Sequence, residues 1–269
     1  MLPDIHCVTQ IIHSVSEKLI LPRFRQLRKY EIQEKTPGDF VTIVDIEVEQ
    51  YLKKKLIKLV PSSLAVGEEE VESTPMVLER LRGNSPVWVL DPLDGTGNFA
   101  NGREPFTVIV AYCHGGETLM GWVHDPLNAT TICAVKGQGC WMENQRLRIP
   151  NPPDLKDMTG SLSKRYAERI IEIEGSPQNL RRVGCVGKDY IDLALGNLNF
   201  ARYSHHLKPW DHAAGILLHT EAGGHNHLIK AGKSYYPTLM PAEAIANKEV
   251  LLLAPDMHTI ETIAYLLDE

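Results

Sequence analysis

The sequence predicts a layered protein of the α+β and α/β classes, built from two halves with different rhythms. Residues 1–150 show helical periodicity at first and then a run of short strands separated by turn residues, the pattern of an antiparallel sheet. Residues 151–269 alternate short strands with helices, which is typical of a layered α/β unit. The stretch 149–160, which contains three prolines, predicts the boundary between the halves.

The N-terminal half opens with two predicted helices. The first covers 4–28 and is interrupted at Pro22, which lacks a backbone donor. The stretch 34–42 carries turn residues and predicts a loop. A second helix over 42–60 follows, because apolar residues recur there at i, i+4, i+8 and i+11: Val48, Leu52, Leu56 and Leu59. We expect these four side chains to face the core.

Short strands and further helices follow in order. Strands are predicted at 63–70, 85–91 and 106–116, and an antiparallel hairpin with its continuation at 118–147. The third strand rests on an alternation of large residues: Phe106, Val108, Val110 and Tyr112. In the C-terminal half the predicted order is strand, helix, strand, helix and a final helix: 181–186, 189–196, 199–205, 210–224 and 257–269.

Composition excludes several classes of protein. The net charge of -6, the pI near 6.0 and the lack of a Lys/Arg-rich stripe exclude a nucleic-acid partner. No apolar stretch reaches the ~18 residues of a membrane span, and the N-terminus lacks the basic region of a signal peptide. The five cysteines are odd in number and form no CxxC, which favours free thiols in a reducing compartment. We therefore expect a cytoplasmic protein without a membrane partner.

Acidic residues stand where three predicted elements end or begin. The run 68–70 follows one strand, Asp91 and Asp94 follow the next, and Asp211 lies where a helix should start. Taken singly, such residues are usually a solvated turn or a helix N-cap. Together they place carboxylates at the mouths of buried strands, where lost hydration requires a partner. Because no cluster of arginines lies near them in the sequence, a hard cation such as Mg²⁺ is the natural partner.

The residues after the second aspartate predict an anion site. Gly95, Thr96 and Gly97 can turn sharply into a helix, so that their N–H groups point outward together toward a phosphate. A calcium loop of the EF-hand type does not fit, because the second acid stands at position 4 of the motif and the glycine at position 5. Metal-binding carboxylates beside a phosphate site indicate metal-assisted attack of water on a phosphate ester.

Three motifs resemble those of a known family. The segments "VGEE" at 66–69, "WVLDPLDGTGNF" at 88–99 and "KPWDHAAGILLHTEAGG" at 208–224 look like the three signature motifs of the inositol monophosphatase family, in order and spacing. Residues 38–52 and 121–147 resemble its early helix and central hairpin, so the resemblance covers most of the chain. These proteins are Mg²⁺-dependent, often lithium-sensitive phosphomonoesterases of the fructose-1,6-bisphosphatase-like superfamily.

The resemblance implies a five-layer αβαβα sandwich with the active site between its halves. It also implies two or three Mg²⁺ ions per site. The implied metal ligands are Glu68, Asp91 and the Leu93 carbonyl for the first ion, Asp91, Asp94 and Asp211 for the second, and Glu68 with Glu69 for a weaker third.

Roles toward water are implied as well. Thr96 with Asp45 would position or activate the attacking water, and Glu68 would be a further catalytic residue. A purely structural alternative stays open for the first two. Thr96 would then be a helix N-cap, and Asp45 the acid of a capping box with Thr42.

The sequence says less about the residues that bind the substrate than about the metal ligands. The Gly95 and Thr96 amides would bind the phosphate, and the other candidates for substrate contact are Asp211, Lys35, Lys208 and Arg103. The chain departs from the family before Asp211, where enzymes acting on inositol phosphates usually place a Glu about seven residues earlier, whereas this chain has "YSHHLKPWD" and no acid. Gly97 also stands where relatives commonly carry Thr, Ser or Lys.

Two histidines precede the last motif. Predicted as strand neighbours, His205 and His206 should point to opposite faces, so that one at most reaches the site. The substrate stays open among inositol-phosphate-like, sugar, nucleotide and amino-alcohol phosphates.

Two function classes remain. The first is a phosphatase acting on a small phosphorylated metabolite. The second is a family member with dispensable catalysis that serves as a regulatory or protein-binding partner. The resemblance further implies a homodimer, which no feature of the sequence specifies.

Overall fold

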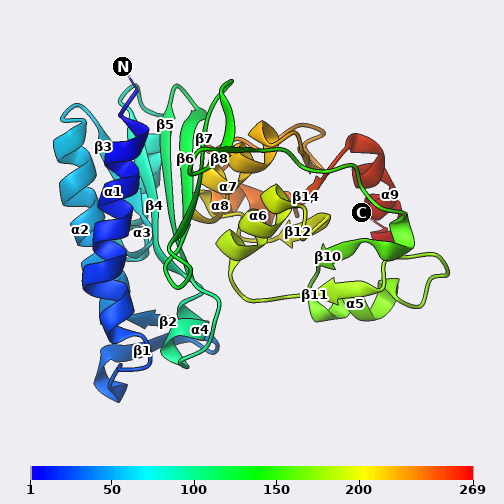
Figure 1. Cartoon of the computed structure of the whole chain (residues 1–269), viewed down its shortest axis with the longest axis horizontal. Helices are drawn as coiled ribbons and strands as arrows, with labels where there is room; N and C mark the ends of the chain where they lie inside the picture. Colours follow the sequence, from blue (N-terminus) through cyan, green and yellow to red (C-terminus); the bar gives the residue numbers. More distant parts are fainter. Residues whose placement is uncertain (1, 269) are drawn as a thin grey trace.

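The computed structural model describes residues 2–268 and arranges them in five layers (Figure 1). One pair of helices covers the outer face of a seven-stranded sheet, a second pair lies between this sheet and a five-stranded one, and a third pair covers the far face. The αβαβα sandwich implied by the resemblance is confirmed. The pairs, in that order, are α1 (Ile5–Val15) with α2 (Ile43–Leu59), α6 (Val186–Leu195) with α7 (Pro209–Glu221), and α5 (Lys164–Ile170) with α9 (Met257–Leu267).

The seven-stranded sheet follows the chain order, from β3 to β9. All neighbours are antiparallel except β3 and β4, which run parallel, so the antiparallel run predicted for this half begins one strand later. The strands are β3 (Leu64–Gly67), β4 (Val87–Asp94), β5 (Thr107–His114), β6 (Glu117–Asp125), β7 (Thr130–Val135), β8 (Gly139–Met142) and β9 (Gln145–Leu147).

Both faces of this sheet are buried at its centre. The predicted alternation is confirmed, because Phe106, Val108, Val110 and Tyr112 all face α1 and α2. Ile109 and Ala111, which lie between them, pack instead against α7. There the helix approaches β6 so closely that a Cβ on Gly121 would lie 3.0 Å from the Ala214 Cα. This contact fixes the start of α7 near the end of β4.

The five-stranded sheet has the order β11-β10-β12-β14-β13. The strand β10 pairs parallel with β11 and β12, whereas β14 pairs antiparallel with β12 and β13. The bounds are β10 (Thr159–Ser161), β11 (Asn179–Arg181), β12 (Phe200–Ser204), β13 (His225–Leu228) and β14 (Val250–Ala254).

Several short elements complete the chain. The stretch predicted as a loop at 34–42 is instead most of a hairpin, whose strands β1 (Ile32–Thr36) and β2 (Asp39–Thr42) meet at a tight turn. The remaining helices are α3 (Glu68–Ser73), α4 (Thr96–Ala100), α8 (Pro241–Ala246), a π-helical turn at Ser16–Ile20, and 3-10 turns at Leu21–Arg23, Lys29–Glu31, Pro75–Arg82 and Leu155–Asp157. No helix within 2–268 is both long and apolar enough to cross a membrane.

Several sequence expectations differ in detail from the structure. The strand predicted at 63–70 ends at Gly67, because its three acids form the first turn of α3. The helix predicted at 4–28 ends earlier, since α1 stops at Val15 and the turns that follow stop at Arg23. The strand predicted at 181–186 lies slightly earlier in the chain, because β11 ends at Arg181 and a loop leads to α6. Three of the four predicted inward residues of α2 are fully buried, but Leu59 is 36% exposed, because it is the last residue of the helix and extends past the sheet.

Candidate active site

A cavity of about 650 Å³ opens where the two halves of the chain meet. Its walls include the end of β4, the start of α4 and the first turns of α6 and α7, and a cavity of this size can hold a small metabolite. Many predicted site residues line it: Glu68, Asp91, Asp94, Gly95, Thr96, Asp211, Lys208 and Arg103. Four others are not part of its lining: Asp45 and Leu93 contact Thr96, Glu69 follows Glu68 in the chain, and Lys35 contacts Glu69.

Buried negative charge is concentrated around Asp91, which is 2% exposed near the end of β4. Its Oδ1 accepts a hydrogen bond from the Leu93 N–H at 3.1 Å. Burial, together with the charges of Glu68, Asp94 and Asp211, raises the pKa of Asp91 well above its usual value. Burial and the first two of these acids also raise the pKa of Asp211. Such a cluster carries an excess of negative charge, which a bound cation can reduce.

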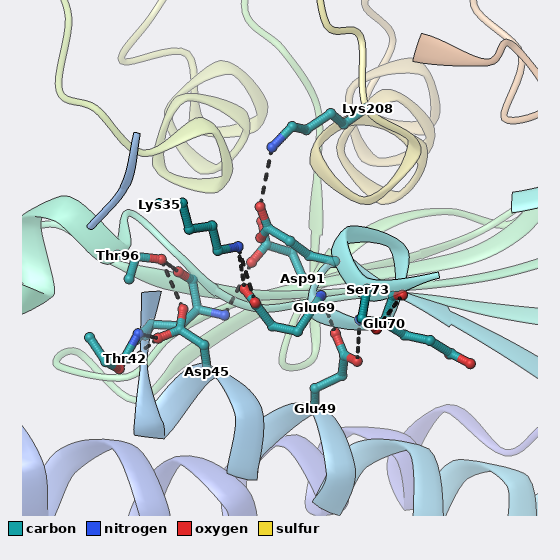
Figure 2. A network of polar contacts seen from close by, with 12 residues as sticks. Lys35, Thr42, Asp45, Glu49, Glu69, Glu70, Ser73, Asp91, Thr96 and Lys208 are labelled. Carbon is teal, nitrogen blue, oxygen red and sulfur yellow. Dashed lines mark hydrogen bonds and ion pairs between the residues drawn. The ribbon is translucent and has the colours of Figure 1, made fainter. Parts of the chain in front are cut away.

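A lysine ammonium already stands among these acids (Figure 2). The Nζ of Lys208, from the residue before α7, lies 3.2 Å from Glu68 Oε1. Burial lowers the pKa of Lys208, but the charges of Glu68, Asp211 and Asp91 outweigh burial, so that the pKa is raised. A lysine that the sequence offered for substrate contact therefore pairs with a predicted metal ligand. A cation held by Glu68 would have to compete with this ion pair.

Asp94 is directed toward α6. Its carboxylate accepts hydrogen bonds from the N–H groups of Val186 at 3.1 Å and Gly187 at 2.6 Å, and from the Thr107 hydroxyl at 3.0 Å. The Cys185 thiol donates to the same carboxylate at 3.0 Å. These donors tie the loop after β4 to the C-terminal half. Burial still raises the pKa of Asp94 despite them.

Thr96 and Asp45 meet across two elements that are far apart in the sequence. The Thr96 Oγ1 lies 2.9 Å from Asp45 Oδ1 and 2.8 Å from the Leu93 carbonyl oxygen. The other oxygen of Asp45 accepts the Thr42 N–H at 2.8 Å, as in the predicted capping box. Asp45 therefore contacts Thr96 with one oxygen and completes the capping box of α2 with the other. The N-cap of α4 is Gly95, so the interpretation of Thr96 as a cap is wrong.

Glu69 lies beside Lys35, with Nζ and Oε2 3.0 Å apart. Burial and the charge of Glu68 raise the pKa of Glu69 to about 7. Burial also raises the pKa of Asp45, to about 6. Lys35, from β1, thus contacts the acid that the resemblance implies for the third ion, and is not itself part of the cavity wall.

The residues fit a site for a hard cation, subject to side-chain movement. All the predicted ligand atoms are oxygens, which Mg²⁺ prefers. Within the described residues, no three His, Cys, Asp or Glu side chains are grouped closely enough to hold a metal ion as they stand. Glu68 turns to Lys208 and Asp94 turns to α6. The raised pKa values show that these carboxylates still carry an excess of negative charge, although the Lys208 ammonium lies among them.

The histidine expectation is wrong in its premise. The strand β12 ends at Ser204, and His205 has a φ of 74°, in the left-handed region. Both His205 and His206 are exposed, and neither lines the cavity. The two side chains are therefore not arranged as strand neighbours.

Other lining residues were not singled out from the sequence, among them Cys185, Asp189, Arg182 and Arg202. Asp189 is buried and accepts hydrogen bonds from Ser161 and Tyr203, which come from strands of the second sheet. The run "RRVGCVGKD" that carries several of these residues has no local pattern that marks it as a cavity wall. The only sequence signal for this part of the wall is that charged residues are rarely buried, so a charged residue among apolar ones is a candidate for a functional site.

The acids predict a pH dependence of stability in the metal-free protein. The pKa values of Asp45 and Glu69 rise on folding, from 3.8 to about 6 and from 4.5 to about 7. At a pH between the unfolded and folded pKa values of each group, the folded chain holds a proton that the unfolded chain has released. The free energy of unfolding should therefore fall as the pH rises through this range. Above the folded pKa values this contribution is lost completely.

Thermal melts in chelator across this pH window measure the effect against the double variant Asp45→Asn, Glu69→Gln, in which neither group titrates. The Tm of the wild type should fall relative to that of the variant as the pH rises. Mg²⁺ should raise the wild-type Tm most at the alkaline end, where the carboxylates are ionised. A wild-type Tm that rises relative to the variant would contradict the burial of these two acids.

The comparisons with known proteins agree on one family. The family model described as the inositol monophosphatase family matches residues 4–261. The protein named Nus factor SuhB of Escherichia coli K12 is 32% identical over 234 residues, which cover 82% of this chain and 83% of that protein. The fructose-1,6-bisphosphatase/inositol-1-monophosphatase of Thermotoga maritima is 29% identical over 189 residues, covering 69% and 70%.

Solved structures share the fold. An IMPase of Thermotoga maritima superposes with a TM-score of 0.79 at 23% identity and covers 97% of this chain and 94% of its own. Inositol monophosphatase-II from Staphylococcus aureus gives a TM-score of 0.74 at 21% identity, with coverage of 97% and 94%. The five-layer arrangement is therefore shared over nearly the whole length of each chain.

Proposed function

The chain belongs to the inositol monophosphatase family, and from this premise we propose that it is a Mg²⁺-dependent phosphatase of small phosphate monoesters. As a member of this family it is a phosphoric monoester hydrolase; the metal and the substrate belong to the proposal. The observation that supports it best is the group of buried carboxylates with raised pKa values around one cavity, beside the Thr96–Asp45 pair.

The proposed ligands are the Glu68, Asp91, Asp94 and Asp211 carboxylates with the Leu93 carbonyl oxygen, and Glu69 would join Glu68 at a weaker third ion. Bound Mg²⁺ would neutralise charge on the phosphate and make a water molecule easier to deprotonate. Gly95 and Thr96 form the start of α4 in the cavity wall, where their backbone amides would bind the phosphate.

The chain's own contribution to proton transfer would come from Thr96 and Asp45. The Thr96 hydroxyl has a single proton and two acceptors, Asp45 Oδ1 and the Leu93 carbonyl. With that proton directed at either acceptor, Oγ1 keeps a lone pair that can accept a hydrogen bond from a water in the cavity. The pKa of Asp45, about 6, leaves its carboxylate mostly ionised at neutral pH and able to orient the hydroxyl.

Two arginines favour a substrate with a second anionic group. Arg103 and Arg182 line the cavity, and within residues 2–268 neither guanidinium has an ion pair or a hydrogen bond. The charge of one phosphate would be met by the proposed ions, so these groups are available for a further phosphate or carboxylate. The absence of an acid just before "HHLKPWD" agrees with a substrate other than myo-inositol phosphate.

Phosphate release from a panel of monoesters tests the proposal. The panel includes sugar, nucleotide, inositol and amino-alcohol phosphates, each with a counterpart that bears a second phosphate or a carboxylate. We expect turnover that requires Mg²⁺, inhibition by excess Ca²⁺ because its coordination is looser, and the highest kcat/KM for doubly anionic substrates. Full activity in a chelator would contradict the metal requirement. Inhibition by Li⁺ is expected from the resemblance.

A regulatory function is the second candidate. It is favoured by the 32% identity with a protein named as a Nus factor. If the folded chain binds Mg²⁺ but releases phosphate from no member of the panel, this candidate replaces the first.

We further propose a cytoplasmic homodimer. The five free cysteines agree with a reducing compartment, and the family resemblance supports a dimer. Light scattering should give twice the chain mass of 30.2 kDa, and a mass of one chain would contradict the dimer.

A further inference from the structure

A second buried carboxylate on α2 lies one helical turn after Asp45. Glu49 is 4% exposed, and its side chain points at the turn between β3 and α3 (Figure 2). Its Oε2 accepts the Glu69 N–H at 2.8 Å, and its Oε1 accepts the Glu70 N–H at 3.1 Å. Glu49 therefore holds the backbone on the C-terminal side of Glu68 without lining the cavity.

The backbone at this turn is shaped around the carboxylate. A Cβ on Gly67 would lie 2.3 Å from the Glu49 Cδ, so only glycine allows the approach. Lys53, one turn further along α2, bridges Glu49 at 2.5 Å and Glu70 at 2.8 Å. The helix itself is anchored by Val44, Val48 and Leu52, each fully buried in the core between α1, α2 and the seven-stranded sheet. The helix α2 therefore holds Glu49 in place, and Glu49 holds the start of α3.

We propose that Glu49 is a positioning residue that holds Glu68 and Glu69 where they can bind Mg²⁺, and so sets the affinity for the ion. The inference rests on the proposed function. The same helix would then fix both sides of the site, with Asp45 orienting Thr96 and Glu49 orienting the first turn of α3. Groups that orient metal ligands typically change metal affinity by ~10- to 100-fold when they are removed.

The chain supplies a matched control. Glu249 is 2% exposed and also accepts two successive backbone N–H groups, from Lys230 at 2.8 Å and Ala231 at 3.0 Å. Its Oε1 also accepts the N–H of Val250, the first residue of β14, at 3.2 Å, and the side chain does not line the cavity. Replacement of either carboxylate by an amide should lower the Tm, because one of the two oxygens that accept backbone N–H groups becomes a donor. Only Glu49 is connected to the predicted metal ligands.

The experiment compares Mg²⁺ binding by the wild type, Glu49→Gln and Glu249→Gln. Titration calorimetry gives the Kd, the Mg²⁺-dependent rise in Tm gives it independently, and phosphate release gives the half-saturating concentration. We expect Glu49→Gln to raise all three measures of Kd by ~10-fold or more, while kcat at saturating Mg²⁺ changes little. Glu249→Gln should lower the Tm and leave the Kd unchanged.

A Kd for Glu49→Gln equal to that of the wild type, with a Tm lowered as in Glu249→Gln, would overturn the inference and leave Glu49 a structural acceptor. Should Glu49→Gln not fold, Glu49→Asp decides the matter, because it keeps the charge but shortens the side chain by one methylene, so that the carboxylate no longer reaches both amides. We expect a rise in Kd in that variant, and an unchanged Kd would overturn the inference. Absence of Mg²⁺ binding by the wild type would instead contradict the proposed function.

Discussion

Asp91→Asn should lower kcat by on the order of 10³-fold or more at saturating Mg²⁺, because the stabilisation that a catalytic metal gives to the transition state amounts to several kcal/mol. Asp91 is the least exposed of the predicted carboxylate ligands, and burial together with repulsion from Glu68, Asp94 and Asp211 raises its pKa. An asparagine keeps the shape of the side chain and one oxygen, but it removes the charge that would attract the cation. Steady-state phosphate release over a wide range of Mg²⁺ concentration measures the loss.

The fold should persist in this variant. Removal of one of several like charges relieves repulsion in the metal-free protein, so the Tm in chelator should not fall. A matched control is Asp125→Asn. Asp125 begins the same tripeptide, Asp-Pro-Leu, and accepts the N–H of Leu127 at 3.0 Å as Asp91 accepts that of Leu93, but it does not line the cavity.

We expect Asp125→Asn to keep normal kcat. Near-normal turnover of Asp91→Asn would show that the ligand assignment is wrong. Equal losses in the two variants would point to the local turn and away from the metal.

Thr96→Ala and Asp45→Asn should each lower kcat by ~10²-fold or more, the range for loss of a positioned proton-transfer group. The two side chains are joined at 2.9 Å across helices α2 and α4, and Thr96 lines the cavity. Since they would act as one unit, the double variant should lose barely more than either single variant. Thr96→Ser, which keeps the hydroxyl, should retain most of the rate.

A structural role would give a different result. Asp45 caps α2 through Thr42, so its loss also costs stability, ~1 kcal/mol for a cap. Thr96 is not a cap, and Thr96→Ala should therefore lower kcat with little change in Tm. Asp256→Ala, which removes the N-cap of α9, is the control for cap loss alone and should lower Tm at normal kcat. Additive losses of kcat in the double variant would contradict the paired role.

The elements that were predicted well are those with enough residues to display a period. The helix α2 and the strand β5 carry several turns or alternations, and the residues at those positions occupy the core as expected, apart from the last one of α2. The strands β10 and β11 have three residues each, too few for a pattern to emerge. The β1–β2 hairpin was hidden because β1 has no buried residue and β2 is only four residues long, so neither carries an apolar alternation.

The candidate site divides in the same way. Asp91, Asp94 and Thr96 lie within six residues of the chain, so their proximity follows from the sequence alone, as does the Thr42–Asp45 cap. The family and its αβαβα fold also followed from the three motifs. All these inferences depend on residues that are neighbours in the chain or on motifs of fixed spacing.

Only the tertiary structure decided the partners of these residues. Lys208 reaches Glu68 across 140 positions, and Asp94 accepts the amide of Gly187 across 93. Glu49 finds the amides of α3, although its place in α2 resembles that of any helix acid. The sequence determined which groups must be buried and charged. Close packing of the layers determined which of them meet. A buried polar group needs a hydrogen-bond partner, and here that partner comes from a distant segment that no local sequence pattern identifies.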